Sequence, residues 1–462
     1  MGGCFRGFSF HQIWYDLGLI YAKVSENILR NYSSVGIGFG PANIAVAIAL
    51  NGASYKSYNR HIFFDSREEP SWHPGLLFDV STMQISFLKD LVTMVNPTSE
   101  FTFLNYLKER GRMHEFINLR TFYPRRTEFD DYLRWASDKL SNFSRFNHEI
   151  TEINLEDDNN VEYTSLIVTV KDKKSGREEN VITDNIIVSD GGIPKWPFDI
   201  DQTTTNRIFH GSETLGKLEK YDLNREEDYI FHVVGSGQSS ADIINYLGDQ
   251  YPNSKIILTH RSFSMRPEDD SHFVNELFMP DAVSMFQEMS QDARDSVIKD
   301  YWHVTHSGVT LDLLPKLYEK VYYDRASGRN RYSFNRFSEI IAGYEVDNRT
   351  FIKVRNIHTG DVEEIGADFT ILATGYQRPC PHPLLKSFDH ILEKIEDQTA
   401  YEIDHNYRVK TKAKTNFSIY MQGYAERTHG FSETLLSLMP ERAARIAAEL
   451  AVTDNQYRKL AV

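Results

Sequence analysis

Two copies of one short pattern constrain this chain more than any other feature: an apolar segment, a Gly-x-Gly turn and a run of small residues. The first copy spans residues 33–48 and the second spans residues 229–244. Each copy predicts a strand, a tight turn and a helix whose N-terminus faces the phosphates of a dinucleotide. One Gly-rich turn alone is a weak signal, because such turns also occur in ordinary loops. Two copies in one chain predict two bound dinucleotides.

The first copy contains Gly36, Gly38 and Gly40, followed by Pro41. Gly36 is expected to permit the turn, and Gly38 to let a pyrophosphate approach the backbone. Pro41 suits the first helical turn, because its missing N–H would be unpaired there anyway. The next predicted strand ends in Asp65, which can accept a hydrogen bond from a free ribose hydroxyl. This unit therefore favours FAD or NAD.

The turn of the second copy is built from Gly235, Gly237, Ser239 and Ser240, with Ser240 where a third glycine would stand. The strand that follows ends in Arg261, whose guanidinium can pair with a 2′-phosphate. This unit therefore favours NADPH.

Charge and cysteine content narrow the class of partner. The chain has 462 residues, a formal net charge of −14 and no dense run of Lys or Arg. This charge argues against nucleic acid or an anionic membrane as a partner, so a small molecule is expected. Cys4 and Cys380 are the only cysteines, which predicts no disulfide framework and no thiolate metal site and favours a reducing cytoplasm. No metal-ligand spacing is visible in the sequence.

Residues 1–30 are expected to form a peripheral extension. The apolar run 13–22 is too short to be a signal peptide or a membrane span, and Asp16 interrupts it. The start Met1-Gly2-Gly3-Cys4 is similar to an acylation signal, but Arg6 stands where Ser or Thr is required.

Gln84 and Lys89 interrupt the otherwise apolar segment 81–91. Such polar groups either face solvent or line a pocket that takes a flavin ring and an anionic ligand group. The residue pattern alone leaves both interpretations open.

With these motifs in order, the chain resembles the flavin-dependent N-hydroxylating monooxygenases that act on ornithine, lysine and related amines in siderophore biosynthesis. The resemblance extends from Val35 to Ile446. Its carriers are Gly36-Ile37-Gly38-Phe39-Gly40-Pro41-Ala42-Asn43, Ser71-Trp72-His73-Pro74-Gly75, Met83-Gln84 through Leu91, the Gly235 unit, Met265-Arg266-Pro267 through Glu276, Ala373-Thr374-Gly375-Tyr376 and His429-Gly430-Phe431-Ser432.

The resemblance implies FAD and NADPH as cofactors, O2 as co-substrate and a C4a-hydroperoxyflavin that oxidises the terminal primary amine of L-lysine or L-ornithine. It also implies a homotetramer. The site residues that it implies are Trp72, His73, Thr374 and Gly375 beside the cofactors, Gln84 against the isoalloxazine, Lys89 and Asn275 at the amino-acid end of the substrate, Ser432 near flavin and substrate, and Arg261 on the NADPH phosphate. Gln84, Asn275 and Ser432 form the expected catalytic set.

One position departs from the family pattern. Ornithine-specific members carry Thr-Asn-Tyr-Ser where this chain has Thr305-His306-Ser307-Gly308, so His306 replaces an Asn that contacts substrate and nicotinamide. The alternative substrates are the decarboxylated amines putrescine, cadaverine and histamine, with His306 as a substrate contact.

The predicted fold is α/β, with two dinucleotide-binding Rossmann-like domains and a small, mostly helical substrate region. The apolar strand 368–376 contains Ala-Thr-Gly and is expected to complete the first domain, so that the NADPH domain is inserted in the FAD domain. The expected divisions are an N-terminal extension at 1–30, the first part of the FAD domain at 31–205, the NADPH domain with a helical substrate segment at 206–345, and the completed FAD domain with a C-terminal helix at 346–462.

Three other classes share part of this pattern. A flavin disulfide reductase would need a local cysteine pair, which Cys4 and Cys380 do not form. A carbon- or sulfur-oxygenating flavin monooxygenase is the closer alternative, and the substrate that suppresses peroxide release would distinguish it. A non-catalytic flavin-binding protein would leave the polar set Gln84, Lys89, Asn275 and Ser432 without a purpose.

Overall fold

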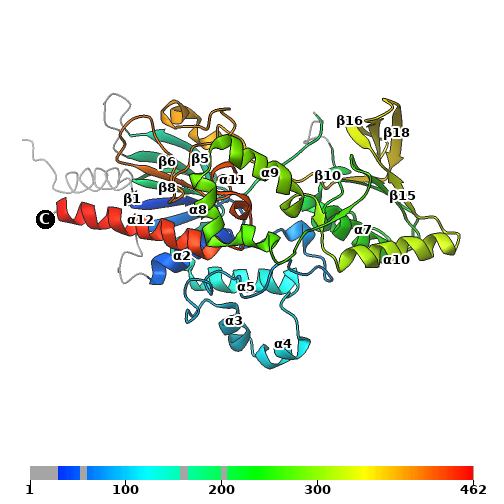
Figure 1. Ribbon diagram of the computed structural model, residues 1–462, viewed down its shortest axis with the longest axis horizontal. Coiled ribbons are helices and arrows are strands. Elements are labelled where there is room, and N and C mark those ends of the chain that lie inside the picture. The colour runs from blue at the N-terminus through cyan, green and yellow to red at the C-terminus, as the bar shows by residue number, and fades with distance from the viewer. Residues whose placement is uncertain (1–29, 53–59, 157–164, 199–204, 461–462) are drawn as a thin grey trace, which may run out of the picture.

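Two five-stranded parallel sheets form the centres of two bodies that lie side by side (Figure 1). The computed structural model describes residues 30–52, 60–156, 165–198 and 205–460. The expected extension therefore lies outside the described residues apart from Arg30, which begins a strand. The α/β class is confirmed, with several separate sheets.

The first body is built on the sheet with strand order β21-β8-β2-β3-β4. Its strands are β2 (Ser34–Ile37), β3 (His61–Asp65), β4 (Ser144–Phe146), β8 (Asn185–Val188) and β21 (Ser418–Met421). Residues of β2, β3 and β8 are buried throughout, as expected for parallel strands covered on both faces.

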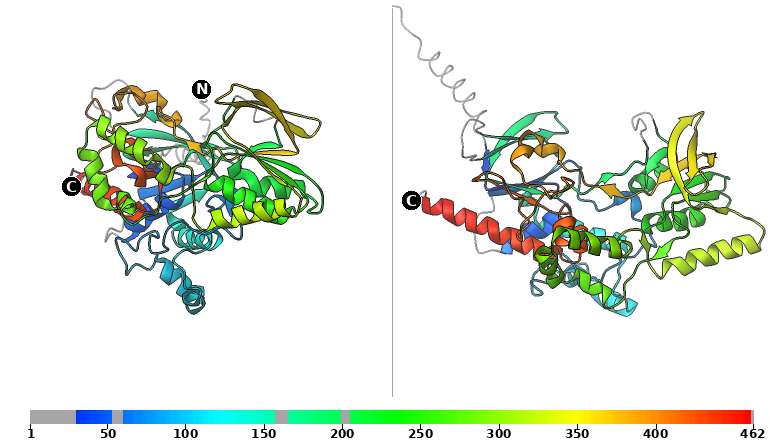
Figure 2. Two further views of the ribbon diagram at one scale, coloured as in Figure 1. Left: turned by 45° about the vertical axis from the view of Figure 1, so that its right-hand side comes forward. Right: turned by 45° about the horizontal axis from the view of Figure 1, so that its top comes forward.

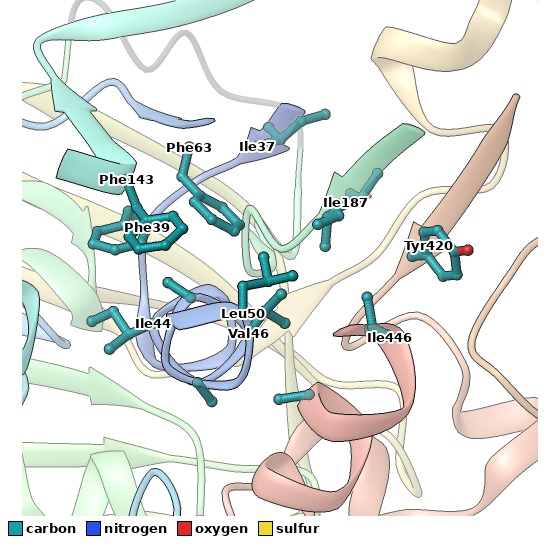
Figure 3. Packing of buried hydrophobic residues seen from close by; sticks show 14 of the residues in the cluster. Ile37, Phe39, Ile44, Val46, Leu50, Phe63, Phe143, Ile187, Tyr420 and Ile446 are labelled. Carbon is teal, nitrogen blue, oxygen red and sulfur yellow. The ribbon is translucent and has the colours of Figure 1, made fainter. Parts of the chain in front are cut away.

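Helix α2 (Pro41–Gly52) lies in the centre of this body and is packed against α5 (Arg126–Lys139) and the C-terminal helix α12 (Met439–Leu460). Figure 3 shows the cluster: Phe39 and Phe63 lie above α2, Ile44 lies on one side of this helix, and Ile446 of α12 lies beyond its other side. The small residues of α2 allow these close approaches.

A second, four-stranded sheet of this body has the order β1-β7-β6-β5. Its strands are β1 (Arg30–Tyr32), β7 (Glu178–Thr183), β6 (Leu166–Asp172) and β5 (His148–Leu155), and helices α3 (Phe103–Glu109) and α4 (Met113–Leu119) complete the body below α5 in Figure 1.

The second body is built on the sheet β10-β19-β11-β12-β15. Its strands are β10 (Ile208–His210), β19 (Phe369–Leu372), β11 (Ile230–Val234), β12 (Lys255–Thr259) and β15 (Tyr332–Asn335), with helices α6 (Thr214–Tyr221), α7 (Gln238–Gln250) and α10 (Leu313–Ala326). An antiparallel sheet of β16 (Ser338–Val346), β17 (Arg349–Asn356) and β18 (Val362–Ala367) packs its buried side chains against β10 and β19.

The expected division at residue 345 is wrong. β19, which was expected to complete the first domain, pairs in parallel with β10 and β11 of the second sheet. The chain leaves the first sheet after β8 and returns to it only at β21. The reason is that an apolar strand followed by small residues fits either nucleotide-binding sheet, so its composition does not say which one it joins.

A helical segment of the inserted region returns to cover the first body. Helices α8 (Pro280–Glu288) and α9 (Gln291–Thr305) lie against α11 (Glu426–His429), as both Figure 1 and Figure 2 show. The short strands β13 (Arg266–Pro267) and β14 (Gly308–Val309) pair at the two ends of this segment. The expected helical substrate segment therefore contacts both bodies.

Candidate active site

The first glycine turn connects β2 to α2. Gly38 has φ +79°, and a Cβ there would lie 2.7 Å from the carbonyl oxygen of Ser189. Gly36 lies within β2 rather than in the turn, and it is required because a Cβ would collide with the ring of Phe63. At Gly40, by contrast, a Cβ would meet no heavy atom of the described residues within 4 Å.

This turn fits a dinucleotide pyrophosphate. The open face at Gly40 adjoins the first turn of α2, which begins at Pro41 as predicted. Backbone N–H groups at a helix N-terminus favour phosphate, and a glycine beside them leaves room for it.

Asp65 holds the turn in place. Its carboxylate accepts hydrogen bonds from the backbone N–H of Phe39 at 2.8 Å and from Arg67 Nη2 at 2.6 Å. Burial raises the pKa of this carboxyl, but the hydrogen bonds and charge of Arg67 and the bond from Phe39 outweigh burial, so the net pKa lies below its usual value. Asp65 is thus ionised at neutral pH and holds the turn through its bond from Phe39. Ribose binding by Asp65 stays a prediction.

Buried polar side chains connect this turn to the C-terminal helix. Asn43 donates to the carbonyl oxygen of Gly38 at 2.7 Å and accepts from Gln422 at 2.8 Å. Gln422 in turn accepts from Arg442 of α12 at 3.1 Å, and Arg442 forms an ion pair with Glu433 at 3.1 Å. Sequence reasoning missed Gln422, Glu433 and Arg442, because no local pattern links these three segments.

The second glycine turn connects β11 to α7. Gly235 has φ +131° and packs against the carbonyl of Ala373. Gly237 caps α7, and Ser240 donates to the Gly237 carbonyl at 2.7 Å. Ser239 lies beside it in the first turn of α7, half-buried.

Arg261 follows β12 and is exposed. The neighbouring Ser262 hydroxyl lies 3.4 Å from the Ser236 hydroxyl in the glycine turn, which places Arg261 close to that turn. Its position fits a phosphate at the edge of the second nucleotide site.

The remaining cofactor candidates of the first body are Trp72 and His73, and the His73 ring lies 6.2 Å from that of Tyr376, which follows β19. Trp72 donates its backbone N–H to Asp130 at 2.7 Å, and His73 adopts a left-handed conformation with φ 50°. Burial and the charges of nearby arginines lower the pKa of His73 to about 4, so its imidazole is neutral.

Thr374 and Gly375 follow β19 at the point where the chain crosses between the bodies. The Thr374 hydroxyl donates to the carbonyl of Lys195, and the Gly375 carbonyl accepts from the backbone N–H of Lys195 at 2.9 Å. These two residues thus belong to the crossing segments that set the position of one body relative to the other.

Gln84 is exposed and donates from Nε2 to the Glu268 carboxylate at 2.5 Å. Gln84 belongs to the first body, whereas Glu268 follows β13 in the inserted region. Burial raises the pKa of Glu268, and the Gln84 hydrogen bond opposes the rise only in part. Sequence reasoning did not single out Glu268, although it lies within the motif that begins at Met265.

Lys89 is half-buried, and the buried Asp90 holds its turn by accepting from the backbone N–H groups of Thr93 and Phe103, each at 2.7 Å. Burial lowers the pKa of Lys89, and the carboxylate of Glu441 on α12 opposes this shift. The buried Oε2 atom of Glu441 has no hydrogen-bond partner among the described residues. The Lys89 ammonium and the Glu441 carboxylate therefore interact electrostatically.

Asn275 and Ser432 lie on neighbouring short helices, Val274–Phe278 and Phe431–Thr434. The Asn275 amide donates to the carbonyl of Asp270 at 2.8 Å, and Ser432 is buried. The structure thus brings together two of the three expected catalytic residues, from segments far apart in the sequence.

His306 stacks on Trp302 with ring centroids 3.6 Å apart, and its Nε2 atom lies 3.7 Å from a carboxylate oxygen of Glu426. Burial, together with the charge of Arg378, lowers the pKa of His306 to about 4. Burial raises the pKa of Glu426. His306 is therefore a neutral ring, aligned by stacking.

The described residues hold no group of three or more His, Cys, Asp or Glu side chains arranged to bind a metal ion. Within the same part of the chain, no helix has both the length and the apolar character needed to cross a bilayer.

Comparison with known proteins adds three findings. A family model described as L-lysine 6-monooxygenase/L-ornithine 5-monooxygenase matches residues 30–378. L-ornithine N(5)-monooxygenase of Pseudomonas aeruginosa is 34% identical over 418 residues, which cover 90% of this chain and 93% of that protein. Two solved structures are similar as well. The Kutzneria sp. 744 ornithine N-hydroxylase, solved with reduced FAD, NADP+ and L-ornithine, has a TM-score of 0.85 and 30% identity, with 92% of this chain and 100% of that chain covered. L-lysine 6-monooxygenase from Pseudomonas syringae has a TM-score of 0.79 and 28% identity, with 91% of this chain and 99% of that chain covered.

Proposed function

This chain belongs to the L-lysine 6-monooxygenase/L-ornithine 5-monooxygenase family, and from that membership we propose that it N-hydroxylates the side-chain amine of L-ornithine for hydroxamate siderophore assembly. It is an NADPH-dependent flavin monooxygenase, with FAD and NADPH as its cofactors. The preference for ornithine over lysine is supported by identities of 34% and 30% to two ornithine enzymes, against 28% to the lysine enzyme.

The two Rossmann-like halves hold the cofactors in this proposal. FAD binds along the first glycine turn, at the open face of Gly40, and the adenosine phosphate of NADPH pairs with Arg261 beside the second turn. The flavin, once reduced by NADPH, supplies the chemistry that activates dioxygen. Gln84 faces the flavin ring, and the residues where the bodies meet exclude water from it.

The charges at Lys89 and Glu441 carry the assignment of an amino acid as the substrate. An amino acid has a carboxylate for the Lys89 ammonium and an α-ammonium for the unpartnered oxygen of Glu441. A decarboxylated diamine has no carboxylate, so it would leave Lys89 facing a second cation. Asn275, on the short helix beside that of Ser432, supplies a further polar group in this proposal.

The reacting amine needs a site that favours its neutral form, because a free alkylamine has a pKa of about 10.4. A neutral His306, stacked on Trp302, does not repel an approaching amine. Desolvation between the two bodies disfavours the ammonium form. The replacement of the family Asn by His306 is thus compatible with an amino-acid substrate.

The test is a pair of variants, Lys89→Met and Glu441→Gln, assayed for hydroxylamine formation from L-ornithine and from putrescine. We expect Lys89→Met to raise the KM for L-ornithine by about tenfold or more, because the substrate carboxylate loses its ion pair. The same change should improve the use of putrescine relative to L-ornithine. Glu441→Gln should raise the KM for L-ornithine while the rate of flavin reduction by NADPH stays near the wild-type value.

Lys316→Met serves as the control, because Lys316 lies exposed on α10 of the second body. An unchanged KM for L-ornithine in Lys89→Met would contradict the proposed amino-acid site. The homotetramer stays a prediction from the family resemblance.

A further inference from the structure

We propose that Glu268 is a positioning residue that fixes the orientation of the Gln84 amide beside the flavin. The proposal rests on the function above, in which Gln84 faces FAD. It begins from the 2.5 Å hydrogen bond between Gln84 Nε2 and the Glu268 carboxylate, which joins the first body to the inserted region.

A carboxylate has a directional consequence for a side-chain amide. An ionised carboxylate only accepts hydrogen bonds, so it must face the NH2 group of Gln84 and not its carbonyl oxygen. The amide oxygen is then turned away from Glu268. With a neutral partner that both donates and accepts, the amide could rotate by half a turn and exchange donor and acceptor. A given atom at the edge of a flavin ring either donates or accepts, so only one orientation of the amide is complementary to the atom that it faces.

Glu268 is itself held from the side of the second nucleotide site. Its backbone N–H donates to the carbonyl of Val309 at 2.9 Å, and a Cβ at Gly308 would lie 2.8 Å from its Cα atom. The adjacent Ser307 packs against Gly237, where a Cβ would lie 3.1 Å from the Ser307 Cα. A short chain of contacts therefore leads from the second glycine turn through residues 307–309 to Glu268 and Gln84.

A second contact ties the segment before Gln84 to the same body. Asp242 of α7 accepts from the Ser81 hydroxyl at 3.0 Å and forms an ion pair with Arg126 at 3.0 Å. Residues 81–84 are thus held at both ends by carboxylates of the inserted region. Because the backbone is anchored through Ser81, the loss of Glu268 should release the Gln84 amide without moving the segment.

The arrangement predicts a pH dependence. Burial, with contributions from the carboxylates of Asp270 and Asp312, raises the pKa of Glu268, whereas the Gln84 hydrogen bond and the charge of Arg126 lower it, with a net rise. Above this pKa the carboxylate is ionised and holds the amide in one orientation. As pH falls through it, Glu268 gains a proton that it can donate, and the constraint on Gln84 is lost.

The test compares Glu268→Gln, Glu268→Asp and Asp312→Asn, each loaded with FAD, across a range of pH. The measured quantities are the hydroxylamine formed per NADPH oxidised, the dissociation constant of FAD and the absorbance spectrum of the bound flavin. Glu268→Gln keeps the side-chain size but permits both amide orientations. Glu268→Asp keeps the charge but withdraws it from Gln84 by one methylene. Asp312→Asn removes a nearby exposed carboxylate that makes no contact with Gln84 in the structure.

We expect Glu268→Gln and Glu268→Asp to lower the hydroxylamine yield per NADPH by about fivefold, the loss expected when one charge-assisted hydrogen bond is removed. In Glu268→Gln the fall of the yield at low pH should disappear, and the flavin spectrum should shift. FAD affinity should stay within about twofold of wild type, because the glycine turn is untouched. Asp312→Asn should match wild type in FAD affinity, in flavin spectrum and in yield at neutral pH, while the fall of the yield moves to lower pH because one carboxylate that raises the pKa of Glu268 is gone.

Wild-type yield, spectrum and pH profile in Glu268→Gln would overturn the proposal, as would an equal loss in Asp312→Asn, which would indicate a charge effect alone. The wild-type enzyme separates this result from the proposed function. If wild type hydroxylates no amine while the flavin spectrum still shifts in Glu268→Gln, the assigned substrate fails and the positioning role of Glu268 stands.

Discussion

Gly38 and Gly40 lie two residues apart in the first turn, yet a methyl group would meet different surroundings at each. At Gly38 the backbone conformation and the Ser189 carbonyl both exclude a side chain. At Gly40 a methyl group would project into open space, on the face proposed for the pyrophosphate. The protein itself therefore requires glycine at position 38, whereas at position 40 only the proposed pyrophosphate would require it.

Gly40→Ala should consequently lower FAD affinity while leaving the cofactor-free protein folded. We expect the dissociation constant for FAD to rise by about tenfold or more, since the methyl group occupies space that the pyrophosphate needs. Gly38→Ala should lose both FAD and thermal stability, because its φ of +79° is strained for alanine. Flavin content and the melting temperature of the cofactor-free protein measure the two effects. Gly52→Ala, at the exposed end of α2, is the control. Unaltered FAD binding in Gly40→Ala would refute this placement of the pyrophosphate.

At the scale of elements, helix α12 is joined to the first glycine turn by buried polar contacts as well as by apolar packing. Arg442 and Glu433 are both almost fully buried, with side chains 4% and 1% exposed. Removing one partner of a buried ion pair leaves an uncompensated charge and costs about 3–5 kcal/mol. The same pair leads through Gln422 to Asn43, so it stabilises the turn as well as the helix.

Arg442→Met should therefore lower the melting temperature of the FAD-loaded enzyme by about 6 °C or more. Replacing Glu433 by Gln in the same chain should recover part of the loss, because the unpaired charge is then absent. Arg408→Met breaks an exposed ion pair with Asp404 and should shift the melting temperature by only about 1–3 °C. Differential scanning calorimetry measures both melting temperatures. If Arg442→Met and Arg408→Met lower the melting temperature equally, the buried pair does not have the stabilising role proposed for it.

Local patterns predicted the two strand-turn-helix units, because glycine turns and small-residue helices are encoded over fewer than twenty consecutive residues. They did not assign β19 to the correct sheet, since an apolar strand is compatible with either one. Sequence order also predicted Gln84, Lys89, Asn275 and Ser432 as site candidates through the family resemblance. The sequence did not indicate Glu268 or Glu441. Glu268 meets Gln84 only because the inserted region folds back on the first body, and Glu441 comes near Lys89 only because α12 packs there.

At the scale of the whole molecule, the insertion places the two nucleotide-binding sheets side by side and returns a helical segment over the first body (Figure 2). Asn275 of the inserted region and Ser432 of the first body lie on neighbouring elements, and Lys89 with Glu441 belongs to the first body. In the proposed function, the side-chain nitrogen of an amino acid is oxidised at the junction between the two bodies.

The most direct test is mass analysis of the products formed by the wild-type enzyme with FAD, NADPH and O2. L-ornithine, L-lysine, putrescine, cadaverine and histamine are offered separately, and NADPH oxidation and hydrogen peroxide are measured alongside. We predict a product of L-ornithine that carries one additional oxygen atom on its side-chain nitrogen, with little peroxide released. Strong turnover of a diamine or of histamine, with no product from either amino acid, would contradict the account.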